Sequence, residues 1–131
     1  MKQGKAIYNL LSSASAVTDI VANRIYPLRV PDKTAFPCIT YQTISNVPYN
    51  SKSGFTSYQS RVQVNVFEND YNNAFILSDA IKTALADKVG TFGSVVVQGT
   101  KFLNQIDQEE DFADGFGLVH FILDFNITYN E

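Results

Sequence analysis

A strict alternation of apolar and polar side chains in two segments constrains the fold of this chain more than any other sequence feature. Between residues 58 and 68, Val62, Val64 and Val66 occupy every second position, with polar residues such as Arg61 and Gln63 between them. Residues 117–129 repeat the pattern with Val119, Phe121, Leu123, Phe125, Ile127 and Tyr129. Successive side chains of a strand point to opposite faces, so both segments are predicted to be strands with one buried face.

Three other segments have the apolar spacing of helices. Residues 3–12 and 16–23 are predicted to form two short helices, because apolar side chains recur there at intervals of three and four. The serine-rich stretch between them interrupts the pattern, and Ser15 is placed to cap the second helix. A longer helix is predicted over residues 71–87, with the pair Asn69–Asp70 available as its cap.

The remaining segments are assigned from prolines, β-branched residues and turn residues. Two prolines four positions apart exclude a helix at residues 24–31, which are expected to form an extended arm or an irregular edge strand. Strands are predicted over residues 37–45, 94–98 and 101–108. Residues 46–57 are rich in Asn, Ser, Gly and Pro and are predicted to form a long loop, either functional or disordered.

The predicted order of elements is α-α-β-β-α-β-β-β, in one domain that spans residues 1–131. A chain of 131 residues has the length of one domain and buries enough surface for a core without metal or disulfide support. The strands after residue 93 follow one another too closely for helical crossovers. The sequence therefore predicts an α+β fold, with a mostly antiparallel β-sheet and the helices packed on one face.

Charge and cysteine content restrict the partners and the compartment. The net charge is −3 and the ten basic residues are scattered, which argues against specific nucleic-acid binding. The single cysteine, Cys38, lies in an apolar run and is predicted to be an inert core thiol in a reducing compartment. No signal peptide or membrane-spanning run is recognisable, so the protein is expected in the cytoplasm and away from membranes.

The reactive side chains do not form a known catalytic motif. The one histidine, His120, falls on the polar side of its strand, where a solvent-facing or interface role is favoured. The acidic residues of the predicted 109–115 loop allow three interpretations: a solvated hairpin loop, an electrostatic contact with another subunit, or a Mg²⁺ or Ca²⁺ site. Their spacing does not match an EF-hand, so no metal, cofactor or catalytic residue is predicted. The local carboxylates are Asp107, Glu109, Glu110, Asp111 and Asp114.

Several apolar and aromatic stretches resemble the tail-completion family, the head-to-tail joining proteins of long-tailed bacteriophages. The order of elements agrees with that family over most of the chain, whereas residues 99–116 match nothing recognisable. The stretches that carry the resemblance are residues 6–11 (AIYNLL), 16–21 (AVTDIV), 24–28 (RIYPL), Pro31, 36–42 (FPCITYQ) and 61–67 (RVQVNVF).

The resemblance implies a non-enzymatic structural protein of the virion, assembled in the host cytoplasm and located at the junction of tail and head. It implies a homo-oligomeric ring, with six subunits expected, that caps the head-proximal end of the tail tube and stops its polymerisation. The implied partners are other copies of the chain, the major tail tube protein and the head connector or head-closure protein.

Exposed polar, proline and aromatic residues in the extended arm and the two predicted loops are candidates for the subunit or partner interface. The same prolines and aromatics are also consistent with an ordinary surface connection and with loop anchors. The candidate interface residues are Arg29, Pro31, Tyr49, Phe55, Glu109, Glu110 and Asp111.

Two other functions remain open at the level of sequence. A head-closure adaptor of the same particle would also form a ring but would bind only the connector. A small hydrolase would use the 107–114 carboxylates with a divalent cation, and chelation would then abolish its activity.

Overall fold

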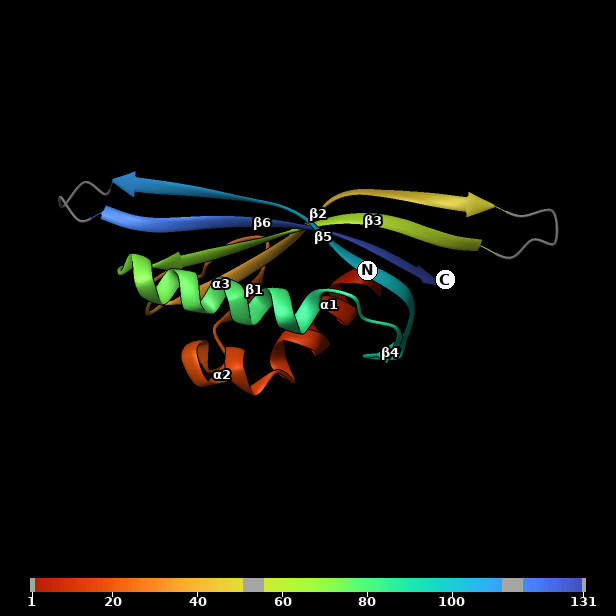
Figure 1. Ribbon diagram of the computed structural model, residues 1–131, viewed down its shortest axis with the longest axis horizontal. Coiled ribbons are helices and arrows are strands. Elements are labelled where there is room, and N and C mark those ends of the chain that lie inside the picture. Colours follow the sequence, from red (N-terminus) through yellow and green to blue (C-terminus); the bar gives the residue numbers. More distant parts are fainter. Residues whose placement is uncertain (1, 51–55, 112–116, 131) are drawn as a thin grey trace.

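The computed structural model describes residues 2–50, 56–111 and 117–130, which form three helices and six strands (Figure 1). Within these ranges, side chains are described except for those of residues 50, 56, 110, 111 and 117. The helices are α1 (Lys2–Ser12), α2 (Ser15–Val21) and α3 (Tyr71–Leu85). The strands are β1 (Ile25–Pro27), β2 (Cys38–Asn50), β3 (Thr56–Glu68), β4 (Gly90–Phe92), β5 (Val95–Asp111) and β6 (Gly117–Asn130).

All six strands belong to one sheet in the order β1-β2-β3-β6-β5-β4. Only β1 and β2 pair in parallel, and every other neighbouring pair is antiparallel. The three helices lie together on one side of the sheet, and the β2–β3 and β5–β6 hairpins point in opposite directions (Figure 1). The predicted α+β class and the one-sided helix layer are confirmed.

The two segments with strict alternation form the centre of the sheet. In the register of β3 with β6, Val62 lies opposite Phe125 and Val64 lies opposite Leu123. All four side chains are buried. The valine face of β3 and the aromatic and aliphatic face of β6 therefore point to the helices, as the alternation predicts.

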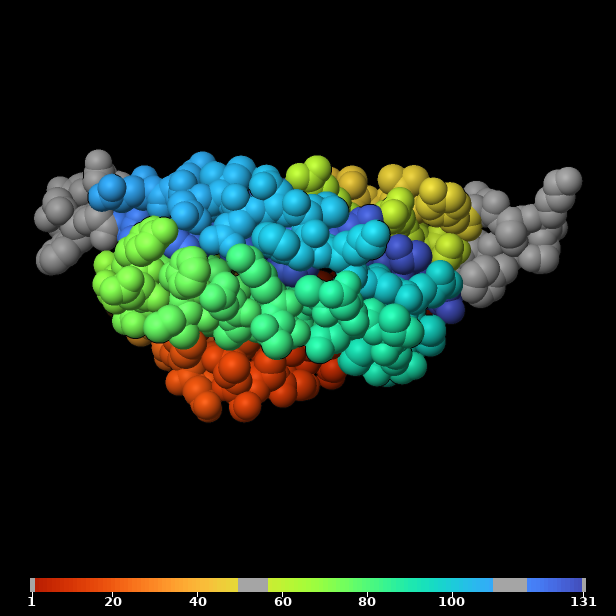
Figure 2. Space-filling model, in the orientation of Figure 1, coloured from red at the N-terminus to blue at the C-terminus, as the bar shows by residue number. Residues whose placement is uncertain are grey.

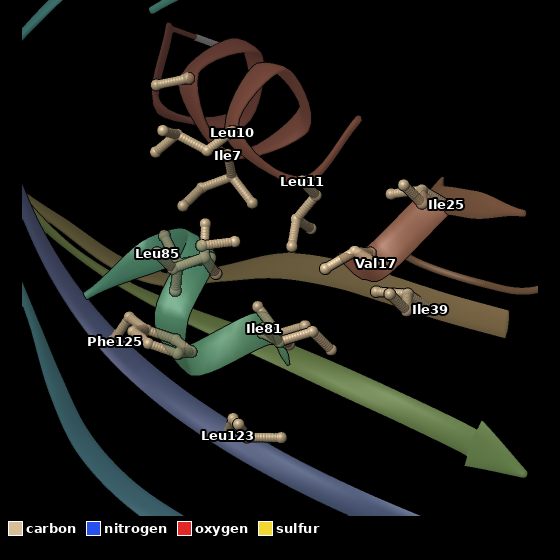
Figure 3. Packing of buried hydrophobic residues seen from close by; sticks show 14 of the residues in the cluster. Ile7, Leu10, Leu11, Val17, Ile25, Ile39, Ile81, Leu85, Leu123 and Phe125 are labelled. Atoms are coloured by element: carbon tan, nitrogen blue, oxygen red, sulfur yellow. The ribbon is translucent and has the colours of Figure 1, made fainter. Parts of the chain in front are cut away.

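The helices supply the other half of this core. Ile7, Leu10 and Leu11 of α1 point toward Ile81 and Leu85 of α3, above the sheet (Figure 3). The α2 helix adds Val17, which lies beside Ile25 and Ile39 of the first two strands (Figure 3). Residues three and four apart on a helix share a face, so each helix contributes one apolar stripe.

The capping predictions gave mixed results. Asp70 is the N-cap of α3, and its side chain accepts a hydrogen bond from the backbone N–H of Asn73 at 3.3 Å. The prediction for Ser15 is wrong. Ala14 is the N-cap of α2 without a side-chain cap bond, and Ser15 is already the first helical residue. The Ala14 backbone carbonyl accepts from Val17 and Thr18, which starts the helix one residue earlier.

The proline-rich arm contains a short edge strand, as one of its two interpretations predicted. The β1 strand pairs with β2 from Ile25 opposite Ile39 to Pro27 opposite Tyr41. A proline lacks the N–H that continued pairing needs, and it is tolerated at a sheet edge.

The predicted loop over residues 46–57 is wrong at both ends. The β2 strand continues to Asn50 and β3 begins at Thr56, so that Val47 pairs with Gln59 and Tyr49 with Ser57. Residues 51–55 lie outside the described residues. Long antiparallel pairing supplies the backbone hydrogen bonds here, and it overrides the local preference of Asn, Ser and Pro for turns.

The two strands predicted at 94–98 and 101–108 are one continuous strand, β5, with irregular register near Gly99 and near Leu103. The buried Thr100 hydroxyl donates to the Leu85 carbonyl and accepts from the Lys88 N–H, which ties this part of β5 to the end of α3. These contacts satisfy orphan groups at the helix end, so the strand passes through the Gly-Thr pair.

The predicted acidic loop at 109–115 also needs correction. Glu109, Glu110 and Asp111 belong to β5, and Glu109 pairs with Val119 of β6. Asp114 and Gly115 lie outside the described residues.

We expect Val64→Ala to lower the free energy of unfolding by about 1–3 kcal/mol, because it removes fully buried methyl groups from the centre of the core. Gln59→Ala, on the opposite face of the same strand, is the matched control and should cost less than about 0.5 kcal/mol. Urea unfolding of both variants measures the difference, and an equal loss would contradict the assigned faces.

Candidate interaction surfaces

The predicted interface residues fall at two different edges of the sheet. Arg29 and Pro31 are exposed in the segment between β1 and β2, and Tyr49, on the outer part of β2, is 61% exposed. Glu109 is exposed on β5, which is separated from β2 by β3 and β6. The sequence prediction therefore combined two separate surfaces.

Three of the predicted residues have no described side chain. Glu110 and Asp111 belong to β5 but only their backbone is described, and Phe55 lies outside the described residues.

An open groove of about 820 Å³ lies at the β2 edge. The α1 helix provides Lys5 and Tyr8 as one wall, Leu28 at the end of β1 provides another, and Tyr41 and Thr43 of β2 also line it. Leu28 is 71% exposed and has a positive φ of 67°, and its N–H donates to the Tyr41 carbonyl. The groove is lined mainly by carbon atoms and carries one cation, Lys5.

Gly93, in the turn between β4 and β5, also lines the groove. Gly93 has a φ of +56°, and a Cβ at this position would come within 3.0 Å of the Lys5 backbone carbonyl. A larger residue would therefore push the turn away from α1.

Tyr41 gives the groove a hydrogen-bonding hydroxyl. Burial, followed by the effect of Tyr8, raises the pKa of the Tyr41 hydroxyl above its ordinary value. Tyr41 therefore stays protonated at neutral pH and can donate a hydrogen bond to an acceptor in the groove.

We call the residues exposed along this edge the groove surface. It consists of Lys5, Tyr8 and Leu28, which line the groove and are exposed. Val47 of β2 is also exposed, but it pairs with Gln59 and so lies on the sheet face away from the helices.

The opposite edge of the sheet carries a second surface where α3 lies against β5 (Figure 2). The Tyr71 hydroxyl donates to the Asp107 carboxylate at 3.5 Å, and its ring meets Phe121 edge-on at 5.4 Å. Farther along, the Lys82 ammonium lies 4.9 Å from the centre of the Phe102 ring. Phe75 follows Tyr71 by four residues and so lies on the same helix face.

This second edge is rich in exposed aromatic and acidic groups. Tyr71, Phe75 and Phe102 are 53%, 49% and 38% exposed. Asp107 and Glu109 are exposed on β5, at alternate positions and therefore on one face. We call these five residues the acidic surface.

The sheet face away from the helices has a polar network rather than a reactive site. The Arg61 guanidinium is 2.7 Å from Asp124, whose carboxylate also accepts from Gln63 at 3.4 Å. Gln63 in turn accepts from Gln42 at 3.2 Å, so the network crosses β2, β3 and β6. Asp124 is only 5% exposed, and these contacts compensate for its burial.

The remaining reactive side chains are engaged inside the fold. Cys38 is buried, which raises the pKa of its thiol to about 11, while nearby Arg24 lowers it and Glu68 raises it. The predicted core position of this thiol is confirmed, and its inertness stays a prediction. His120 is half-buried on the predicted face, stacked on Phe67 at 4.4 Å and hydrogen-bonded to Asn65 at 2.8 Å.

The described residues bring together no group of three or more His, Cys, Asp or Glu side chains that could hold a metal ion. None of the described helices is long and apolar enough to cross a bilayer.

The comparison with protein families decides the affiliation of the chain. Residues 5–130 match the model of the family described as tail completion protein gp17. This chain belongs to that family. No curated protein matches it.

A solved structure of a virion contains a chain with the same fold. A chain in the structure of the virion of a native gene transfer agent (GTA) particle is similar with a TM-score of 0.79. The similarity covers 96% of this chain and 92% of that one, at 16% sequence identity. A structural role in tail completion follows from the family, and this likeness supports the fold.

Sequence reasoning missed most of the two surfaces of this tail-completion protein. Tyr71 and Phe75 flank the start of the buried apolar stripe of α3 without belonging to it. The sequence therefore does offer a signal that these two aromatic side chains are exposed. Tyr8 and Leu28 carry no such signal, because only the folded chain brings α1 next to the end of β1.

We expect Cys38 to remain unmodified by an aromatic disulfide reagent at pH 8 in the native protein. With a pKa of about 11, about one thiol in a thousand is ionised at that pH, and burial blocks access to it. Ser12→Cys, at an exposed position, is the control and should react at the rate of a free thiol. Rapid native-state labelling of Cys38 would contradict its burial.

Proposed function

We propose that this chain is a non-enzymatic virion protein that caps the head-proximal end of the tail tube of a long-tailed bacteriophage. It acts as a hexameric ring that stops tube growth and joins the tail to the head. Its partners are other copies of itself, the major tail tube protein and the head connector or head-closure protein. It is assembled in the host cytoplasm and remains at the tail–head junction of the virion.

The observation that carries this proposal is the family match over residues 5–130. The similar chain in a gene transfer agent virion is consistent with a place in a phage-like particle.

The arrangement of the two surfaces supports a ring. A ring is formed when one surface of each subunit binds a different surface of the next and the rotation closes. The groove surface and the acidic surface lie at opposite edges of one sheet and differ in charge and composition. A subunit with two such surfaces is suited to head-to-tail contacts.

The chemistry of the described side chains supports a structural role. The single cysteine is buried, with its pKa raised to about 11. The single histidine stacks on Phe67 and bonds Asn65. Asp124, the most buried carboxylate in the polar network, is paired with Arg61.

We expect the purified protein to form closed rings, alone or on tail tubes. Light scattering should give about 88 kDa, six times the 14.6 kDa chain, and negative-stain images should show rings. A phage without this protein should accumulate tails of uncontrolled length and separate heads. A chain that stays monomeric both at high concentration and with tubes present would contradict the ring.

A further inference from the structure

We propose that the groove surface of one copy binds the acidic surface of the next, with Lys5 facing Asp107 and Glu109 across the contact. The inference rests on the proposed ring and specifies the two surfaces that close it. The occupant of the groove is thus a second copy of this chain.

Charge complementarity is the first argument. The α1 helix contains Lys2 and Lys5 but no acidic residue, and Arg29 lies beyond the end of β1, which borders the groove. On the other edge, Asp107 and Glu109 are exposed carboxylates, and the nearby cation Lys82 is already ion-paired with Asp79. Within the described residues, none of Lys2, Lys5, Arg29, Asp107 and Glu109 takes part in an ion pair. Asp107 accepts hydrogen bonds from Tyr71 and Gln105, but the described residues place no opposite charge against it.

The same charges disfavour contacts between identical surfaces. Two acidic surfaces or two groove surfaces would place like charges opposite each other, which is costly at an interface. The favoured pairing joins unlike surfaces, and that pairing is the one that builds a ring.

The exposed apolar groups are the second argument. Tyr71, Phe75 and Phe102 on one edge are all more than one-third exposed. On the other edge the groove is lined mainly by apolar groups, and Leu28 is 71% exposed beside it. Aromatic side chains that enter an apolar groove are typical anchors of protein interfaces.

The strand edges indicate that side chains, rather than long backbone pairing, form this contact. Among the described residues, β1 covers β2 only as far as Tyr41, and β4 covers β5 only from Val95 to Val97. The open part of β2 contains a register irregularity at Thr43–Ser45 and then Pro48. Bulges and prolines are features that limit the addition of another strand to an edge.

The test uses charge reversal with rescue by mixing. Lys5→Glu and the double variant Asp107→Lys/Glu109→Lys should each weaken assembly at least about tenfold, because like charges then face each other. An equimolar mixture of the two variants should assemble again, since each altered surface then meets an altered partner. Asp19→Lys, an exposed reversal on α2, is the control and should assemble like the wild type.

Sedimentation velocity measures assembly, and thermal melting verifies that each variant folds. If the variants form rings as well as the wild type does, or if the mixture fails to assemble, this assignment is overturned while the ring itself stands. Recovery in the mixture supports it, since a folding defect is not repaired by mixing.

A chemical measurement covers the case in which no ring forms. A zero-length carbodiimide cross-linker is applied to a concentrated mixture of ¹⁴N- and ¹⁵N-labelled wild-type protein, and the products are digested and analysed by mass spectrometry. Mixed-isotope peptides that join Lys5 to Asp107 or Glu109 would support the contact, even where scattering shows that the hexamer is wrong. Mixed-isotope cross-links confined to other pairs, or none at all, would overturn it.

Discussion

The antiparallel pairing of β3 with β6 is the interaction on which the rest of this structure depends. Each strand has an apolar face, and their register brings Val62, Val64 and Val66 level with Phe125, Leu123 and Phe121. Exposure of such an apolar face to water is unfavourable, so other elements must cover it. The three helices provide that cover from one side, and β2 and β5 extend the sheet on either side of the central pair.

The cover is one-sided, and this has consequences for the opposite face. Outward polar side chains of β2, β3 and β6 bond one another, from Gln42 through Gln63 to Asp124 and Arg61. Hydrogen bonds of this kind keep a carboxylate buried without an apolar layer above it. The buried carboxylate on the outer face is thus satisfied within the subunit.

At both edges a short strand covers only part of a long one. The β1 strand spans three residues beside thirteen in β2, and β4 spans three beside seventeen in β5. The uncovered stretches lie next to helices that expose aromatic groups, Tyr8 of α1 on one side and Tyr71 of α3 on the other. Each subunit of a closed ring contacts its two neighbours through two different surfaces, and two unlike edges can provide them.

The sequence by itself determined the central strands, the helix stripes, the Asp70 cap and the buried state of Cys38, because each depends on local spacing or immediate apolar context. The family resemblance from residues such as 36–42 was also sufficient to identify the chain, and the match over 5–130 confirmed it. Local composition misled where long-range pairing prevailed. Residues 46–50 resemble a loop but pair with β3, and Gly99 resembles a turn but lies within β5.

Only the tertiary structure decided where the surfaces lie. The groove needs α1, the end of β1 and β2 to meet, although Tyr8 and Tyr41 are far apart in sequence. The acidic surface forms because α3 lies along β5, as the hydrogen bond between Tyr71 and Asp107 shows. Sequence periodicity shows which face of an element is buried, but it does not show which elements become neighbours. That choice depends on the packing of the complete core, and it set the groove surface and the acidic surface at opposite edges of one sheet.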